Sequence, residues 1–269
     1  ATRMRPGRNC SAKSAGTARF KNVYLLKSLM DTTGRRFKPV FAGLHQVQRF
    51  HKESNGPMAH MGREIPVGPL PPTEAFKLVT RPLAAIGYEF SSPDAVWRLL
   101  NHTNYQASLI QLFCSALVER VRRSPVPKGQ PPTLVDAGRV DSVYMDPEVR
   151  NSIAQRFEWT IQLDNRYRVI ALTAAWLTLE TPESTYPVDQ LRDECRYFWS
   201  DGFADASWED FRALLDEMVG LGVLVRAGDR YGIRSPNVIR LLGSQDEIYR
   251  KLGESNRLEL AASYDPSRY

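Results

Sequence analysis

The stretch SWEDFRALLDEMVGLGVLVRAGDRYGIRSP, residues 207–236, decides the fold of the C-terminal half of the chain. Its first part predicts a helix, because apolar side chains recur at i, i+3, i+4 and i+7 and two glycines follow as a stop. These apolar residues are Phe211, Leu214, Leu215 and Met218. Its second part has two short apolar runs around Ala227-Gly228-Asp229, which predicts a β-hairpin. A helix followed by a hairpin is typical of the winged variant of helix-turn-helix.

Three further helices are expected just before this stretch. Asp146 and Pro147 open a helix whose apolar residues Val149, Ile153, Phe157 and Ile161 recur every fourth position. The segments RYRVIALTAAWL, 166–177, and PVDQLRDECRYFW, 187–199, predict two more. We therefore expect a winged-helix domain over 146–243 and a C-terminal helix with a tail over 244–269.

Residues 71–123 predict a bundle of three short helices. The first follows Pro-Pro-Thr and places Phe76, Val79 and Leu83 on one face, and the second has Ser92 as N-cap with Pro93 at its first position. The third, over 107–122, carries an apolar stripe, which consists of Ile110, Phe113, Leu117 and Val121. Proline and glycine then indicate a linker over 124–145.

Residues 20–70 predict the closing part of an α/β core. A helix with Val23, Leu26, Leu29 and Met30 is expected to end at Gly34. A buried strand at 40–42 and a second apolar run at 63–70 follow, the first without polar alternation, as in a parallel strand covered on both faces. Ligands of such sheets lie outside the carboxyl ends of the strands. The fold class expected is thus mainly α with an α/β remnant.

Residues 1–19 are expected to form a disordered, basic arm. Residues 1–38 hold ten Lys or Arg and one acid, whereas the remainder holds 26 bases and 29 acids, so all the excess positive charge is N-terminal. A general argument for nucleic-acid binding from the pI of about 9.3 therefore fails for the folded body. The string GRNCSAKS, 7–14, lacks the second glycine of a phosphate loop and a preceding strand, and we interpret it as a chance similarity.

Composition predicts a cytoplasmic protein without a membrane segment. There is no run of about eighteen apolar residues and no signal peptide. The three cysteines, Cys10, Cys114 and Cys195, are far apart and odd in number, so reduced, structural thiols are expected.

The order of these parts resembles the C-terminal two-thirds of an AAA+/STAND-type P-loop ATPase from bacteria: partial core strands, a three-helix lid and a winged helix. The stretches that carry the resemblance are FKPVFAGLHQVQRF, PVGPLPPTEAFKLVTRPLAAIGYEF, LLNHTNYQASLIQLFC, RFEWTIQLDNRYR and LLDEMVGLGVLVRAGDRYGIRSPNVIRLLG. The resemblance as a whole covers about residues 20–243. The resemblance implies binding of ATP or ADP with Mg²⁺ by the full-length protein, and self-association through the ATPase core.

Two departures limit what the resemblance implies. No glycine-rich loop with Lys and Ser or Thr and no apolar strand ending in Asp-Glu precedes residue 20. The lid motif is replaced by Gln106, Ala107 and Ser108. Although full-length relatives are expected to be ATPases, we expect no hydrolysis from this chain alone and assign no catalytic residue. A truncated or fragmentary product is one explanation.

The resemblance places six candidate nucleotide-binding residues in two groups. His45 and Gln46 follow the predicted strand, and Arg49 could reach a phosphate; their alternatives are a strand cap and a solvated arginine. The second group is Asn104, Tyr105 and Arg234. In the alternative interpretation Asn104 caps a helix, Tyr105 packs beneath the lid, and Arg234 and Ser235 lie in a surface turn before Pro236.

No metal site is predicted. His45, His51 and His60 have neither helical nor hairpin spacing and no acidic partner.

DNA binding through the helix 208–219 is not expected, because its charged residues are mostly acidic and would be repelled by phosphates. The acids are Glu209, Asp210, Asp216 and Glu217, and the single base is Arg212. The wing residues Arg226, Arg230 and Arg234 leave a weak contact with DNA phosphates open. Two hypotheses remain: the lid and winged-helix portion of a nucleotide-dependent switch ATPase, or a winged-helix module that binds DNA or protein without nucleotide.

Overall fold

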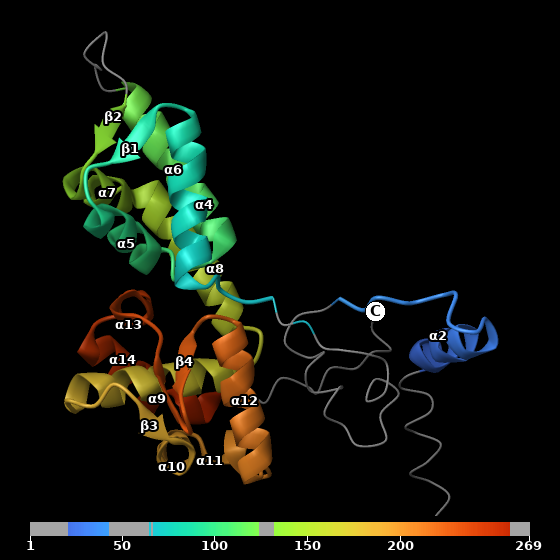
Figure 1. Cartoon of the computed structure of the whole chain (residues 1–269). Coiled ribbons are helices and arrows are strands. Elements are labelled where there is room, and N and C mark those ends of the chain that lie inside the picture. Colours follow the sequence, from blue (N-terminus) through green and yellow to red (C-terminus); the bar gives the residue numbers. More distant parts are fainter. Residues whose placement is uncertain (1–20, 43–64, 66, 124–131, 259–269) are drawn as a thin grey trace, which may run out of the picture. The chain divides into compact units, whose positions relative to one another are not determined.

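The computed structural model describes residues 21–42, 65, 67–123 and 132–258 (Figure 1). The protein is mainly helical, with a few short strands in two small sheets. The chain divides into two compact units, one of residues 1–66 with 262–269 and the other of residues 67–261. Within the described ranges, no helix has the length and apolar character needed to span a membrane.

The first unit contains the helix α2 (Lys21–Thr32), as predicted from its apolar spacing. The chain leaves this helix through Gly34 and Arg35, both at positive φ, so the predicted glycine stop is confirmed. None of the residues of α2 is buried.

The strand predictions at 40–42 and 63–70 are wrong for the residues that the structure describes. Residues 38–42, 65 and 67–70 are in no strand, and Val40 and Val67 are each 93% exposed. A parallel strand needs a hydrogen-bonded neighbour and cover on both faces. The only described parallel pair lies elsewhere, between β1 (Tyr88–Phe90) and β2 (Thr133–Val135).

The first half of the second unit packs five helices and the parallel pair around one core. The helices are α4 (Pro72–Ala85), α5 (Pro93–His102), α6 (Ala107–Arg123), α7 (Ala137–Tyr144) and α8 (Pro147–Ile161). The three helices predicted over 71–123 are confirmed, with Ser92 at the N-cap of α5 and the apolar stripe of α6 buried. We call this cluster, from Ala75 to Ile153, the first core.

The linker prediction for 124–145 is wrong over 133–144, where β2 and α7 lie. Residues 124–131 are outside the described residues. Val135, Val140 and Val143 are buried in the first core. Asp136 caps α7 by accepting a hydrogen bond from the backbone N of Arg139 at 2.8 Å. The short apolar run in this segment folds because β1 offers it a hydrogen-bonding edge.

The second half of the unit alternates helices with a three-stranded sheet. Its helices are α9 (Asn165–Glu180), α10 (Val188–Phe198), α11 (Ser200–Phe203), α12 (Trp208–Gly220), α13 (Pro236–Leu242), α14 (Gln245–Gly253) and the 3-10 turn η1 (Ser255–Arg257). Its strands are β3 (Tyr186–Pro187), β4 (Leu224–Ala227) and β5 (Arg230–Ile233), in the order β3-β5-β4. The predicted hairpin is confirmed: β4 and β5 pair antiparallel, and Gly228 in the turn has a φ of 65°.

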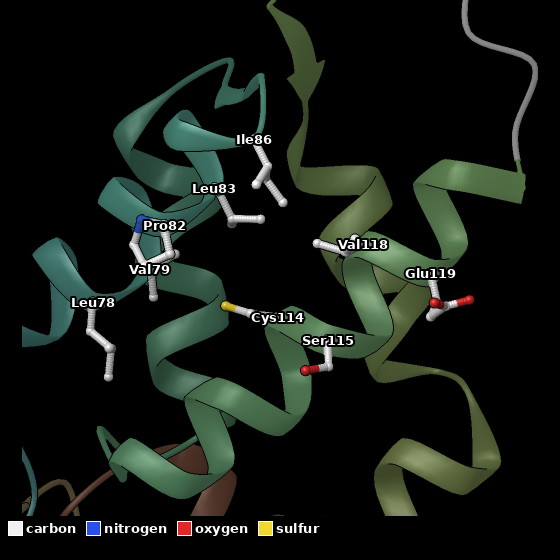
Figure 2. A pocket seen from close by; sticks show the side chains of 9 residues that line it. All are labelled: Leu78, Val79, Pro82, Leu83, Ile86, Cys114, Ser115, Val118 and Glu119. Atoms are coloured by element: carbon white, nitrogen blue, oxygen red, sulfur yellow. The ribbon is translucent and has the colours of Figure 1, made fainter.

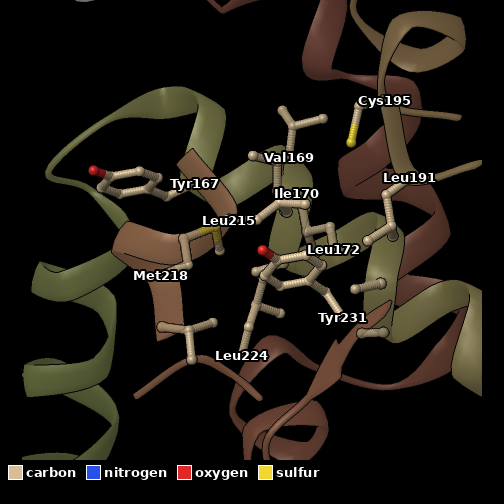
Figure 3. Packing of buried hydrophobic residues seen from close by; sticks show 14 of the residues in the cluster. Tyr167, Val169, Ile170, Leu172, Leu191, Cys195, Leu215, Met218, Leu224 and Tyr231 are labelled. Carbon is tan, nitrogen blue, oxygen red and sulfur yellow. The ribbon is translucent and has the colours of Figure 1, made fainter. Parts of the chain in front are cut away.

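Burial in this half follows the predicted pattern. The apolar face of α12 is buried against α9 and the sheet, together with Leu224 and Tyr231 (Figure 3). We call this cluster, from Phe157 to Leu252, the second core. A capping box between Ser207 and Asp210 fixes the start of α12.

Helix α8 belongs to both cores. Val149 and Ile153 lie in the first core, and Phe157 and Ile161 lie in the second. The four residues recur every fourth position and form one stripe, as predicted. One rigid helix therefore connects the two halves.

Candidate functional site

The junction between the two halves is organised by the turn from α5 to α6. Asn104 and Tyr105 adopt φ angles of 49° and 60°, in the left-handed region that non-glycine residues rarely occupy. Asn104 is only 4% exposed. Such backbone strain persists where neighbouring contacts impose it.

Residues that follow β5 supply those contacts. The hydroxyl of Ser235 donates a hydrogen bond of 2.7 Å to Oδ1 of Asn104. The guanidinium of Arg234 lies 5.8 Å from the ring centroid of Tyr105, a cation–π geometry. Burial lowers the pKa of Arg234, and its Nε is buried without a hydrogen-bond partner. Arginine stays protonated under such conditions, so this buried N–H retains an unmet preference for an acceptor.

The chain that enters the second unit also contacts this turn. The backbone N of Leu70 donates to the carbonyl O of Tyr105 at 2.9 Å. Side-chain Nε2 of Gln106 donates to the carbonyl O of Leu221, also at 2.9 Å. Gly222, at a φ of 80°, leaves no room for a side chain, because a Cβ there would lie 2.6 Å from both Gln106 and Pro69. Four segments therefore meet here: the chain at Leu70, the turn at 104–106, the residues after α12 and the residues after β5.

Asn237, on α13, makes a second polar contact across the junction. Its Nδ2 donates to the carbonyl O of His102 at 2.8 Å, and its Oδ1 accepts from the hydroxyl of Tyr144 at 2.5 Å. The His102 ring stacks on Tyr144 at 3.8 Å between centroids. Burial lowers the pKa of His102, against the opposing effect of Asp141. Asn237 thus connects α13 to α5 and α7.

A pocket of about 200 Å³ lies at the junction. It is lined by Val67, Asn104, Gln106, Ser108, Leu109, Arg156, Phe157, Thr160, Gly220, Leu221, Gly222 and Val223. We call it the junction pocket. Arg156 is the single charged residue among these described lining residues.

A second, more apolar groove of about 330 Å³ lies between α4 and α6 (Figure 2). Its walls are Leu78, Val79, Pro82, Leu83 and Ile86 on one side and Cys114, Ser115, Val118 and Glu119 on the other. Burial raises the pKa of the Cys114 thiol to about 12. The thiol is therefore protonated near neutral pH and is a poor nucleophile.

The structure brings together three of the six sequence-predicted residues. Asn104, Tyr105 and Arg234 lie at the junction, whereas His45, Gln46 and Arg49 lie outside the described residues. The side chain of Asn104 bonds Ser235, and so does not serve as the helix cap considered from the sequence.

Sequence reasoning did not single out Arg156 or Asn237. Asn237 carries no signal beyond its place after Pro236 at a helix start. Arg156 lies on the polar side of a clear amphipathic stripe, which is also the ordinary place for a solvated arginine.

The charge of α12 differs in one respect from the sequence-based expectation. Glu217 is 2% exposed and accepts a hydrogen bond of 2.5 Å from the hydroxyl of Tyr167, so it does not belong to the exposed face. Glu209 and Asp210 are exposed, whereas Asp216 is half-buried and accepts a hydrogen bond of 2.7 Å from the hydroxyl of Tyr231. The donor, Tyr167, lies on helix α9. No periodicity in the sequence indicates that it contacts Glu217.

The side chains of the wing are largely neutralised. Arg226 pairs with Asp216 at 3.5 Å, and Arg230 pairs with Glu183.

Among the described residues no cluster of three or more His, Cys, Asp or Glu has a metal-binding arrangement.

Comparison with known proteins finds no matching protein family, no matching characterised protein and no matching solved structure.

Proposed function

We propose that this chain provides the lid and winged helix of a cytoplasmic, nucleotide-dependent switch ATPase of the AAA+/STAND type. In this proposal another segment supplies the phosphate loop and the Mg²⁺ ligands, and this chain alone does not hydrolyse ATP. The observation that carries the proposal is the meeting of Arg234 and Ser235 with the turn at Asn104 and Tyr105.

The chemistry of this contact suits a sensor of bound nucleotide. Arg234 presents a guanidinium whose Nε has no acceptor, and guanidinium groups bind phosphate oxygens strongly. Tyr105 offers an aromatic face, and Asn104 offers an amide that is already held by Ser235. A nucleotide that contacted the turn would shift the position of the segment after β5, and with it the second core.

The order of elements supports the winged-helix part of the proposal. The elements follow in the order helix α9, short strand β3, helices α10 and α12, and the hairpin of β4 and β5. Strand β3 pairs with β5. This is the arrangement expected when a helix-turn-helix carries a wing that closes a small sheet.

The alternative, DNA binding by the same domain, is less well supported. Phosphate contacts require unpaired cations, whereas Arg226 and Arg230 already pair with carboxylates. Asp216 and two further acids lie on the helix that would face the major groove.

Binding of a fluorescent ADP analogue, measured by polarisation, tests the proposal. We expect tight binding only when the chain is produced together with upstream coding sequence that contains a phosphate loop. Arg234→Ala should then weaken binding at least about tenfold, since one charge-assisted contact is lost. Arg226→Ala, on strand β4 of the hairpin that precedes Arg234, removes an arginine that is paired with Asp216; it serves as the control and should leave binding unchanged.

Two results would overturn the proposal. The first is the absence of any nucleotide binding in the extended protein. The second is salt-sensitive binding of residues 67–258 to duplex DNA in a mobility-shift assay, which would favour the alternative.

A further inference from the structure

We propose that the junction pocket binds a phosphate-sized anion, with Arg156 as its main ligand. This site goes beyond the nucleotide contact at Arg234, because its charged ligand is a different arginine and it needs no phosphate loop; Asn104 lines it as well. Its ligand is a single phosphate group, either free or carried on a larger molecule.

Charge is the first argument. Arg156 is the only charged side chain among the described residues that line the pocket, so no carboxylate there offsets it. Two other arginines of this unit, by contrast, have acidic partners: Arg98 pairs with Asp94 at 2.9 Å, and Arg166 pairs with Asp164 at 2.6 Å. Among the described residues, no hydrogen bond or ion pair joins the guanidinium of Arg156 to another side chain.

Hydrogen-bonding groups are the second argument. Thr160 lies one turn after Arg156 on α8 and lines the same pocket, but its hydroxyl donates to the carbonyl O of Arg156 at 2.9 Å, so the neutral donors for an anion come from α6 and the residue before it. Ser108, at the start of α6, and Gln106 line the pocket as well. One N–H of the Gln106 amide donates to Leu221, which holds the amide in place and leaves its second N–H available. A phosphate group accepts several such bonds at once.

Size is the third argument. About 200 Å³ is below the range of roughly 300–1,000 Å³ that is usual for pockets enclosing drug-sized ligands. The pocket is therefore too small to enclose a whole nucleotide, but it has room for one phosphate and some water. The α4/α6 groove, by contrast, is lined mainly by apolar side chains and includes Glu119, and so does not suit an anion.

The walls of the pocket come from both halves of the unit. Gln106 and Ser108 precede or begin α6, and Gly220 and Gly222 lie at the end of α12. An anion bound to Arg156 would contact both walls. Its binding should therefore stabilise the junction as well as occupy the pocket.

Isothermal titration of the full chain with inorganic phosphate at low ionic strength tests the inference. We expect saturable binding that Arg156→Gln weakens at least about tenfold. The matched control is Arg150→Gln, on the same helix but outside the pocket, which should change the affinity less than about twofold.

A second variant tests the pocket without removing the arginine. Ser108→Glu places a carboxylate in the first turn of α6, where it is compatible with the helix dipole, and it should pair with Arg156. We expect this variant to keep its melting temperature and to lose phosphate binding. Equal phosphate affinity in wild type, Arg156→Gln and Ser108→Glu would overturn the inference, as would an equal loss in Arg150→Gln.

Titrations with ADP and with adenosine distinguish the source of the phosphate. If ADP competes with inorganic phosphate through Arg156 and adenosine does not, the group belongs to the nucleotide. In the protein extended by upstream coding sequence with a phosphate loop, phosphate binding that depends on Arg156 without any nucleotide binding would retain this inference and contradict the proposed function. In the same extended protein, nucleotide binding that depends on Arg234, together with phosphate binding that does not depend on Arg156, would retain the proposed function and contradict this inference.

Discussion

Replacing Asn237 by alanine is expected to destabilise the protein more than any other single polar substitution at the junction. Asn237 is 3% exposed and makes two hydrogen bonds with different partners, the hydroxyl of Tyr144 and the carbonyl O of His102. Alanine at this position removes both bonds. It also leaves two polar groups in a site where Tyr144 is only 8% exposed.

The magnitude follows from these two contacts. A typical hydrogen bond contributes about 1 kcal/mol to stability, and leaving a buried partner unsatisfied costs about 1–3 kcal/mol. Water can reach part of the space left by the amide, so the two penalties are not added in full. We expect a decrease in the free energy of unfolding of about 2–4 kcal/mol.

Urea denaturation followed by circular dichroism measures this change. Tyr144→Phe, which removes only the hydroxyl, should cost about 1–2 kcal/mol by leaving Oδ1 of Asn237 unpaired. The double variant should cost less than the sum of the two, with a coupling energy of about 0.5–3 kcal/mol.

The reasoning is refuted if Asn237→Ala costs less than about 0.5 kcal/mol, the usual effect of a surface substitution. Full additivity in the double variant would likewise show that Tyr144 and Asn237 do not interact. Asn151→Ala, at an exposed position of α8, provides a control that should be close to neutral.

Three further outcomes are expected. Gly232→Ala should lower the melting temperature by several degrees, since its Cβ would lie 1.9 Å from the carbonyl O of Ser184; an unchanged melting curve would contradict this. In a Cys10→Ser, Cys114→Ser background, a thiol reagent at pH 8 should modify the buried Cys195 only after unfolding, and rapid modification of the native protein would contradict its burial. Because burial raises the pKa of the Cys114 and Cys195 thiols from 9.0 to about 12, the unfolded chain releases protons that the folded one retains, and stability should fall between about pH 9 and 12; a flat pH profile of unfolding there would contradict the shift.

Helices were the most predictable part of the fold. The four-residue stripe of α8 and the pattern of α12 specified both the elements and their buried faces, because each helix packs one apolar side against a core. Local turn chemistry placed the β4–β5 hairpin at Gly228.

Short strands were less predictable, because their pairing depends on distant residues. The apolar run at 40–42 has the composition of a buried strand, yet Val40 is 93% exposed. Residues 133–135 stand beside a proline-rich segment and nevertheless pair with β1, some 45 positions earlier in the chain. Composition within a short window does not report such a partner.

Half of the candidate site could be anticipated and half could not. The resemblance placed Asn104, Tyr105 and Arg234 in related roles, and the fold brings them together. Arg156 becomes a candidate anion ligand only in the folded protein, where uncharged residues of α6 and of the end of α12 line the same pocket. Arg156 is exposed, and nothing in the surrounding sequence distinguishes it from the other arginines that face water.

The two roles of α8 determine what the polar contacts at the junction contribute. Its interior holds neither Gly nor Pro, so the helix resists bending, and it is anchored in the first core by Ile153 and in the second by Phe157. The two halves would therefore stay joined even if Asn237 or Asn104 lost its hydrogen bonds. Those bonds instead select one arrangement of the halves about a stiff connection, because buried polar groups penalise every arrangement that leaves them unpaired. A ligand bound at Arg156 or Arg234 would favour one of these arrangements of the two halves. We therefore expect it to change the protection of the junction amides from hydrogen exchange, and not to separate the halves.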